Sequence, residues 1–122
     1  MPYEIFPEKR GLLIVYSGDV SLDELLRSTA ECWAHPDWEN HHYHICDWSA
    51  ATSLAITEEH TELSAGIDRV AFTEGRKFKC AMVNKTPEMI ALSESYIAKS
   101  QSENFEARVF ANVEDARAWV DG

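Results

Sequence analysis

Cysteine is scarce in this sequence, which has 3 cysteines among 122 residues. Cys32, Cys46 and Cys80 are far apart, and no Cys-x-x-Cys spacing occurs. Zinc ribbons and dithiol redox motifs need such closely spaced pairs, and disulfide-rich secreted domains carry more cysteines in an even number. The scarcity argues against these classes, and we expect a protein of a reducing compartment, the cytoplasm.

Basic residues are also few, with 11 Lys and Arg against 21 Asp and Glu and a formal net charge of −10. Proteins that bind polyanions need a basic surface that neutralises phosphates. The only basic cluster here is Arg76, Lys77 and Lys79, at the start of a strand-like run. We therefore expect neither nucleic acid nor an anionic membrane as a partner.

Long apolar runs are missing as well. A transmembrane helix needs about 18 or more consecutive apolar residues, and the chain has no such run. The opening Met1-Pro2-Tyr3-Glu4 lacks the charged and apolar regions of a secretory signal. We expect no membrane insertion, and the length suits a single domain over residues 1–122.

What the sequence does contain is a strand-like apolar run followed by a helix N-cap residue, four times over. Parallel strands need crossover helices, so this alternation predicts an α/β domain with a mostly parallel sheet. Tyr3–Phe6, ahead of the first unit, is expected to form an antiparallel hairpin with Leu12–Tyr16. The prediction is a single mixed five-stranded sheet with about four helices. The four units are Leu12–Tyr16 with Ser21, Tyr43–Trp48 with Thr57, Phe78–Val83 with Thr86, and Ala107–Phe110 with Asn112.

Two connecting segments are predicted from local composition. Gly18-Asp19-Val20 is typical of a turn into a helix that begins at Ser21, where Ser21 and Glu24 have capping-box spacing. Residues 49–56 form the longest stretch of small residues in the chain, between a strand and the N-cap candidate Thr57. We expect residues 47–57 to form a loop beyond the strand tips.

Ligand sites of open α/β sheets lie outside the carboxyl ends of the strands, at a topological switch point. We therefore expect a binding edge there, where Asp47 and Lys85 would form an ion pair or hold a charged molecule. Caps and polar loop residues occur at this edge of any such fold, which is the competing explanation. The candidate residues are Asp19, Asp47, Trp48, Ser49, Thr52, Ser53, Thr57, Asn84 and Lys85.

Catalytic and metal-binding patterns are weak. Strand alternation would place His42, His44 and Cys46 on one face, but a zinc site needs further ligands, for which only His35 or His60 is available. A nucleophilic cysteine needs an adjacent base and an electropositive setting, which this acidic chain does not indicate. We predict no catalytic residue, metal or cofactor, and a non-enzymatic function is favoured over an enzymatic one.

A set of segments spans nearly the whole chain: Tyr3–Ile5, Gly11–Val15, Gly18–Leu26, Asp47, and Arg108–Phe110 with Glu114, Ala116 and Trp119. Together they resemble a family of small bacterial STAS-like proteins, described as similar to stage II sporulation protein AA, the anti-sigma-factor antagonist. The resemblance implies a fold related to lipid-binding Sec14 domains. True antagonists are phosphorylated on a serine in an Asp-Ser-Ser-Gly motif, which is absent here, so only the hydroxyls of Ser49, Thr52, Ser53 and Thr57 lie in the corresponding region.

Two functions remain open from the sequence. The first is a non-enzymatic regulatory module that binds a protein partner through the segment from Asp47 to Thr57 and the adjoining helix, with Trp38 and Trp48 as aromatic anchors. Self-association would use the same surface or the open edge of the first strand. The second is a Sec14-like pocket for a small apolar ligand or lipid, lined by Ile56, Leu63, Ile67, Val70 and Phe72.

Overall fold

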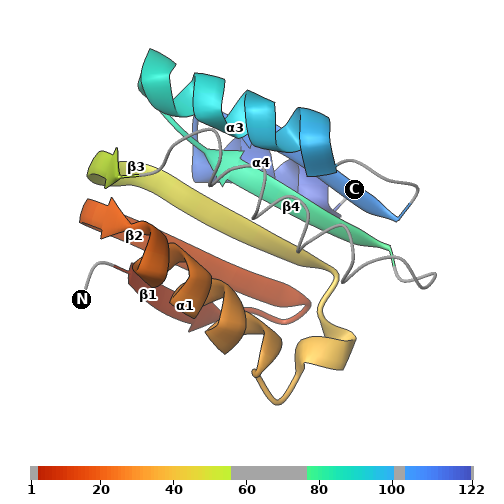
Figure 1. Cartoon of the computed structure of the whole chain (residues 1–122). Helices are drawn as coiled ribbons and strands as arrows, with labels where there is room; N and C mark the ends of the chain where they lie inside the picture. The colour runs from red at the N-terminus through yellow and green to blue at the C-terminus, as the bar shows by residue number, and fades with distance from the viewer. Residues whose placement is uncertain (1–2, 56–76, 101–103, 122) are drawn as a thin grey trace.

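The computed structural model describes residues 3–55, 77–100 and 104–121. Strands and helices alternate along most of this sequence (Figure 1). The elements are β1 (Tyr3–Pro7), β2 (Gly11–Ser21), α1 (Leu22–Trp33), the 3-10 turn η1 (Trp38–Asn40), β3 (Tyr43–Ala55), β4 (Phe78–Val83), α3 (Pro87–Ser100), β5 (Phe105–Phe110) and α4 (Val113–Asp121).

The five strands form one mixed sheet in the order β1-β2-β3-β4-β5. β1 and β2 pair antiparallel, with Ile5 opposite Ile14, and all the other pairs are parallel. The predicted hairpin and the predicted mixed, mostly parallel sheet are therefore confirmed.

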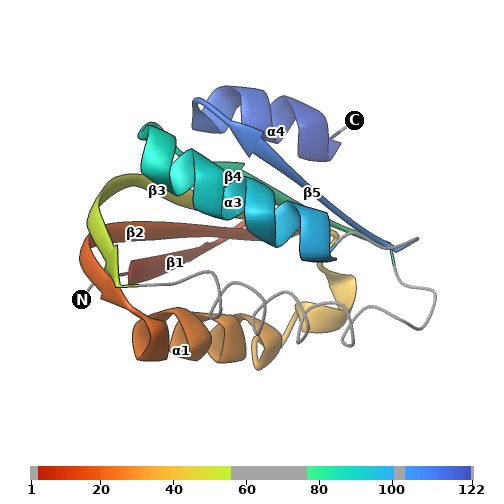
Figure 2. The same cartoon turned by 45° about the horizontal axis from the view of Figure 1, so that its top comes forward.

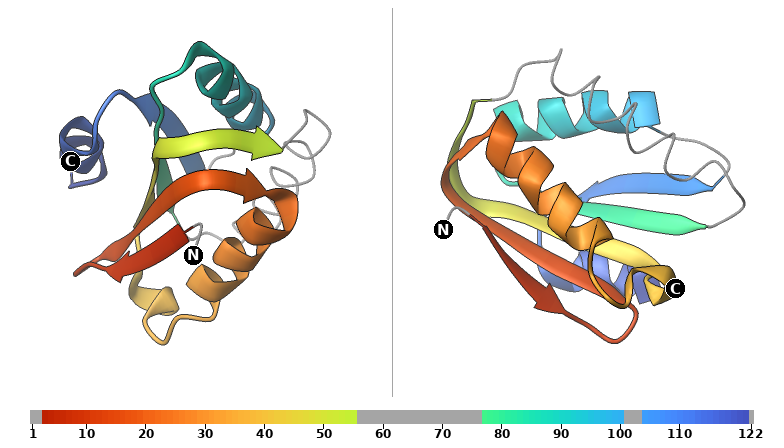
Figure 3. Two further views of the ribbon diagram at one scale, coloured as in Figure 1. Left: turned by 90° about the vertical axis from the view of Figure 1, so that its left-hand side faces the viewer. Right: turned by 60° about the horizontal axis from the view of Figure 1, so that its bottom comes forward.

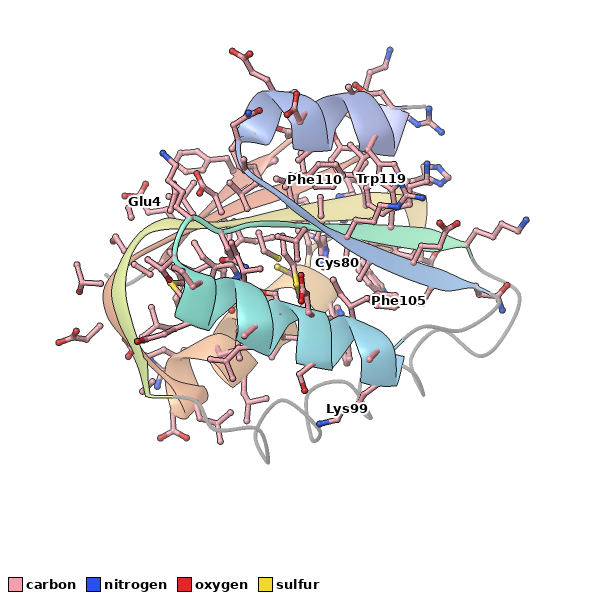
Figure 4. All side chains as sticks on the ribbon, turned by 90° about the horizontal axis from the view of Figure 1, so that it is seen from above. Glu4, Cys80, Lys99, Phe105, Phe110 and Trp119 are labelled. Atoms are coloured by element: carbon pink, nitrogen blue, oxygen red, sulfur yellow. The ribbon has the colours of Figure 1, made fainter. Side chains whose placement is uncertain are left out.

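Helices cover both faces of the sheet. Figure 2 shows α1 and α3 on one face and α4 on the other. In Figure 4, Cys80 and Phe105 lie on the α3 side of the sheet, whereas Phe110 and Trp119 lie on the α4 side. We call these two sides the α1/α3 face and the α4 face.

The α1/α3 face carries two clusters of buried apolar residues. One joins β1, β2 and α1 through residues such as Tyr3, Ile14 and Cys32, and the other joins β4, β5 and α3 through Phe78 and Tyr96. Because strand side chains alternate between faces, the intervening residues point to the α4 face. There Ala116, which is fully buried, packs with Ile45 and Ala81.

Local signals explain where the helices begin. Ser21 Oγ accepts a hydrogen bond from the Glu24 backbone N–H at 3.2 Å, and Glu24 Oε1 accepts one from the Ser21 N–H at 3.0 Å. This is the expected capping box, and its hydrogen bonds lower the pKa of Glu24. At α3, Thr86 Oγ1 accepts from the Met89 N–H at 3.3 Å.

Candidate functional site

The candidate site lies where β2 and β3 extend beyond the strand ends expected from the sequence. The loop expected over residues 47–57 is wrong up to Ala55, because β3 runs through these residues to Ala55. The expected turn at Gly18–Val20 is also wrong, because β2 continues through it to Ser21. The last pairing of β3 with β4 joins Asp47 to Val83, after which β3 pairs only with β2 in the described residues. We call residues 17–21 and 49–55 the β2–β3 ribbon.

The ribbon leaves the plane of the sheet. In the left view of Figure 3, the ends of β2 and β3 run side by side and bend toward the α1/α3 face. β3 is longer than β2 over this stretch, because Val15 pairs with Asp47 whereas Ser21 pairs with Ala55. The extra residues fall at two register shifts, before Ser17 and before Asp19. Such bulges bend a strand and redirect its side chains.

Gly18 lies between these two irregularities, with φ of +66°. A side chain strongly disfavours this left-handed conformation, and glycine adopts it freely. Gly18, which the sequence predicts to lie in a turn, therefore allows β2 to remain paired with the longer, bulged β3.

Two hydroxyl groups of the ribbon are hydrogen-bonded to carboxylates. Ser49 donates to Asp47 Oδ1 from its hydroxyl at 2.6 Å and from its backbone N–H at 2.9 Å. Thr52 Oγ1 donates to Asp19 Oδ1 at 3.3 Å, across the two strands. Ser49, Thr52 and Asp19 are exposed and Asp47 is half-buried, so all four of these predicted site residues are polar groups that solvent reaches.

Trp48 does not belong to this surface. It is 8% exposed and stacks on Tyr16, with ring centroids 3.7 Å apart and an interplanar angle of 3°. The Tyr16 hydroxyl forms a hydrogen bond with Ser28 Oγ at 2.7 Å, and burial holds its pKa well above the ordinary value. Trp48 is therefore a core residue that fixes the base of the ribbon, not an exposed aromatic anchor.

The other predicted anchor, Trp38, is also packed within the protein. Trp38 lies 5.6 Å from His44 and 5.5 Å from Phe78 between ring centroids. His44 in turn packs edge-on against Phe78 at 4.8 Å, whereas His42 is exposed. In the part of the chain that the structure describes, no group of three or more His, Cys, Asp or Glu residues could hold a metal ion.

The adjacent residues Asn84 and Lys85, at the end of β4, have different surroundings. Asn84 is 2% exposed, and its Nδ2 donates to Ser93 Oγ and to the Met89 carbonyl oxygen at 3.5 Å, which ties β4 to α3. Lys85 is exposed. The hydrogen bonds to the carboxylate of Asp47, which was expected to pair with Lys85, come from Ser49. The structure therefore gives these residues different roles: Asn84 holds the fold, and Lys85 faces solvent.

The strand order also bears on the expected ligand crevice. A crevice forms where successive crossovers go to opposite faces of a sheet. Here the strands follow one another in chain order, and the described crossovers, α1 and α3, lie on the same face (Figure 2). The described parallel strands thus show no reversal of strand order, and the binding edge stays a prediction.

Some of the predicted residues fall outside the description. Thr57 and the proposed lining of an apolar pocket (Ile56, Leu63, Ile67, Val70 and Phe72) lie outside the described residues, as does the helix expected after Thr57. Ser53 is described only by its backbone, which pairs with Asp19.

Sequence reasoning missed a polar cluster on the α4 face. Glu8 Oε1, in the β1–β2 connection, accepts hydrogen bonds from the Tyr43 hydroxyl at 2.7 Å and from Arg117 at 2.6 Å. Burial, followed by the contact with Glu8, raises the pKa of Tyr43. No sequence pattern marks this cluster, because its three residues come from distant parts of the chain.

Comparisons with known proteins connect this geometry to a fold. No family model matches the chain, and no curated protein does. Among solved structures, the anti-sigma factor antagonist SpoIIAA in its unphosphorylated form matches with a TM-score of 0.63 and 14% identity, over 98% of each chain. An uncharacterized protein of the DUF3478 family from Shewanella loihica PV-4, with a SpoIIAA-like fold, matches with a TM-score of 0.58 and 14% identity, over 97% of this chain and 91% of the other.

No helix among the described residues is long and apolar enough to cross a membrane.

At 14% identity, the structural matches show the fold and do not assign roles to residues of this chain. The resemblance seen in the sequence is confirmed at that level: this protein has a SpoIIAA-like α/β fold.

Proposed function

We propose that this protein is a non-enzymatic regulatory module of the STAS-like type, and that its β2–β3 ribbon binds a segment of a protein partner. The observation that carries the proposal is the length of β3, which continues from Trp48 to Ala55 after its last pairing with β4. The side of β3 that β4 occupies earlier in the strand has no described strand beside it there.

Strand addition is the mode of binding that fits this geometry. The backbone N–H and C=O groups of an unpaired strand edge accept an extended segment of another chain, and neighbouring side chains select it. Ser49 and Thr52 would supply that selection together with the carboxylates of Asp47 and Asp19. Because these carboxylates belong to a chain of net charge −10, we expect the partner segment to be basic or neutral.

The comparisons are compatible with this proposal. The SpoIIAA structure is named as an anti-sigma factor antagonist, a protein that acts through another protein. The described strands follow one another without a reversal of order, which gives less support to a small-molecule enzyme. The proposal for this chain rests on the ribbon itself, since a shared fold does not carry function.

Site-specific photocrosslinking in the source cells tests the proposal. A photoreactive amino acid is placed at Ala50, which is exposed on the ribbon, and separately at Ala98, which is exposed on α3. We expect Ala50 to give a discrete adduct, identified by mass spectrometry as one other protein, and Ala98 to give none. The same position combined with Asp19→Lys should weaken the adduct.

Three results would speak against the ribbon. Equal adducts at Ala50 and Ala98 would indicate unspecific proximity. The absence of any adduct at Ala50, with a strictly monomeric protein in solution, would remove the interaction surface. An adduct between two copies of this chain would replace the partner with self-association.

A further inference from the structure

The α4 face is only partly covered. α4 is nine residues long and packs against β3, β4 and β5. Neighbouring helices pack about 8–10 Å apart, which is close to the width of two strand spacings of about 4.8 Å. A second helix would therefore fit beside α4, over β1 and β2, where the described part of the chain places none (Figure 2).

The side chains at that position are known from the strand register. Phe6 pairs with Leu13, and Leu13 packs at the border of the cluster beneath α4, which puts both on the α4 face. Val15 lies in the next row of the same face, between Glu4 on β1 and Asp47 on β3. In Figure 4, Glu4 lies on the α4 side of the sheet, away from the helix itself. We call these five residues the β1–β2 strip.

The strip is apolar in the middle and acidic at its sides. Phe6 is 44% exposed, more than any other large apolar side chain that the structure describes. Leu13 and Val15 are half-buried, and Glu4 is exposed. Glu4 and Asp47 lie on the two sides of Val15, whereas Phe6 and Leu13 form an apolar pair in the neighbouring row. This arrangement matches a helix that has an apolar ridge with Lys or Arg beside it.

α4 provides an example of such a helix within the same protein. It covers the neighbouring strands with Ala116 and Trp119, and Arg117 reaches sideways to Glu8 at 2.6 Å. An apolar ridge and a lateral basic side chain are the two features that the strip would recognise in a second helix.

We propose that the β1–β2 strip is a second docking surface, which binds a basic amphipathic helix of a protein partner alongside α4. The charge of the chain argues against the two other occupants. A second copy would bring the same carboxylates and another net charge of −10 against the strip, and an anionic membrane would repel it. The strip shares the Asp47 carboxylate with the contacts of the β2–β3 ribbon, but Phe6, Leu13, Val15 and Glu4 lie outside the ribbon.

Nuclear magnetic resonance of the full ¹⁵N-labelled chain tests this surface. The probe is a synthetic helix of about 14 residues, about four turns, with leucines on one face and lysines on the other. We expect amide shift changes confined to β1, β2 and the adjoining side of α4. Fluorescence anisotropy with the labelled probe then gives the dissociation constant.

Matched variants separate the strip from general attraction to an acidic protein. Phe6→Ser should raise the dissociation constant about tenfold, the loss expected from one buried aromatic anchor. Glu4→Gln should raise it about threefold, and Glu94→Gln, which removes an exposed charge from α3, should leave it unchanged. Circular dichroism establishes that each variant is folded.

Two outcomes would overturn the proposal. If Glu4→Gln and Glu94→Gln weaken binding equally, or the shifts extend over α1 and α3, the peptide binds by net charge alone. If the free protein sediments as a dimer that Phe6→Ser dissociates, a second copy occupies the strip.

Discussion

Trp48 stacks on Tyr16 with the two ring centroids 3.7 Å apart and the rings almost parallel, at the point where β2 and β3 separate from the rest of the sheet. The Tyr16 hydroxyl is in turn hydrogen-bonded to Ser28 of α1. The stack therefore joins the base of the β2–β3 ribbon to the helix that follows β2. A ribbon held in this way is a fixed surface, as a specific recognition site requires.

Removing the Trp48 ring should destabilise the whole protein. Trp48 is 8% exposed, and replacing a buried large aromatic residue with alanine costs about 3–5 kcal/mol through lost burial and the cavity that remains. We expect Trp48→Ala to lower the free energy of unfolding in urea by about 3 kcal/mol, and Trp48→Phe to lower it by about 1 kcal/mol. A change below about 0.5 kcal/mol for Trp48→Ala, the range of surface substitutions, would show that the stack is not part of the core.

Gly18→Ala tests whether the ribbon depends on backbone conformation alone. A Cβ at Gly18 would meet no atom within 4 Å, so any cost comes from φ of +66°. We expect a loss of about 1 kcal/mol in the free energy of unfolding, and a smaller loss for Gly18→Asn, because asparagine tolerates this region better. Equal losses for the two variants would contradict the explanation.

Gly11→Ala makes a useful comparison, because it should fail for a different reason. A Cβ at Gly11 would lie 2.3 Å from the Tyr43 carbonyl oxygen and 2.7 Å from its ring, so the strands themselves would have to move apart. We expect a loss of about 3 kcal/mol, larger than that of Gly18→Ala. Urea unfolding of the two variants in parallel measures the difference between steric exclusion and conformational strain.

The sequence predicted the sheet well where local and tertiary signals agree. The alternation of apolar runs with caps such as Ser21 and Thr86 identified the parallel strands and the starts of α1 and α3, since a cap satisfies backbone groups within its own turn. The hairpin of β1 with β2 followed from two apolar runs joined by a turn-rich connector.

The ribbon could not be predicted in the same way. Gly18 and the small residues after Trp48 are typical of turns and loops, and nothing local reveals that they lie opposite each other. Their strand conformation comes from mutual pairing with two bulges, which is a tertiary effect that overrides local preference. Asp19, Asp47, Ser49 and Thr52 were identified as site candidates from the expected edge, but their pairing into two hydroxyl–carboxylate contacts required the register.

Alkaline pH should destabilise the protein partly through Cys32. Burial raises the pKa of the Cys32 thiol from its ordinary value of 9.0 to about 12. The unfolded chain therefore loses the thiol proton above about pH 9, whereas the folded chain keeps it until about pH 12. The unfolded state then binds fewer protons, and the free energy of unfolding falls as pH rises through this window.

Urea unfolding at pH 8 and at pH 10.5 measures this contribution. The wild-type protein should lose more stability between the two values than Cys32→Ala or Cys32→Ser, because neither alanine nor serine titrates in this range. Other buried groups, including Tyr16, are present in all three proteins, and burial is the main cause of the raised pKa of Tyr16, so most of their contribution cancels in the comparison. An identical loss in all three proteins would mean that the Cys32 thiol does not contribute to the pH dependence.

Glu8 should couple α4 to the sheet through its two hydrogen-bond donors. Tyr43 and Arg117 both donate to Glu8 Oε1, and the Glu8 side chain is only 15% exposed, so its carboxylate depends on these partners for compensation. We expect Tyr43→Phe and Arg117→Met each to lower the free energy of unfolding by about 1 kcal/mol. The Arg117 value falls at the lower end of such effects, because that side chain is 43% exposed and screened by water.

The double variant decides whether the three residues act as one unit. Two donors to the same carboxylate oxygen compete and also support each other's geometry, so their effects should differ from a sum by about 0.5 kcal/mol or more. Urea unfolding of the single and double variants gives this coupling energy, and the same cycle with Glu8→Gln as background should abolish most of it. Strictly additive losses would show that Tyr43 and Arg117 stabilise the protein independently of each other. If Arg117→Met alone leaves the free energy of unfolding unchanged, Arg117 contacts Glu8 without stabilising the attachment of α4. In that case the use of α4 as the example for a docked basic helix would lose its energetic support.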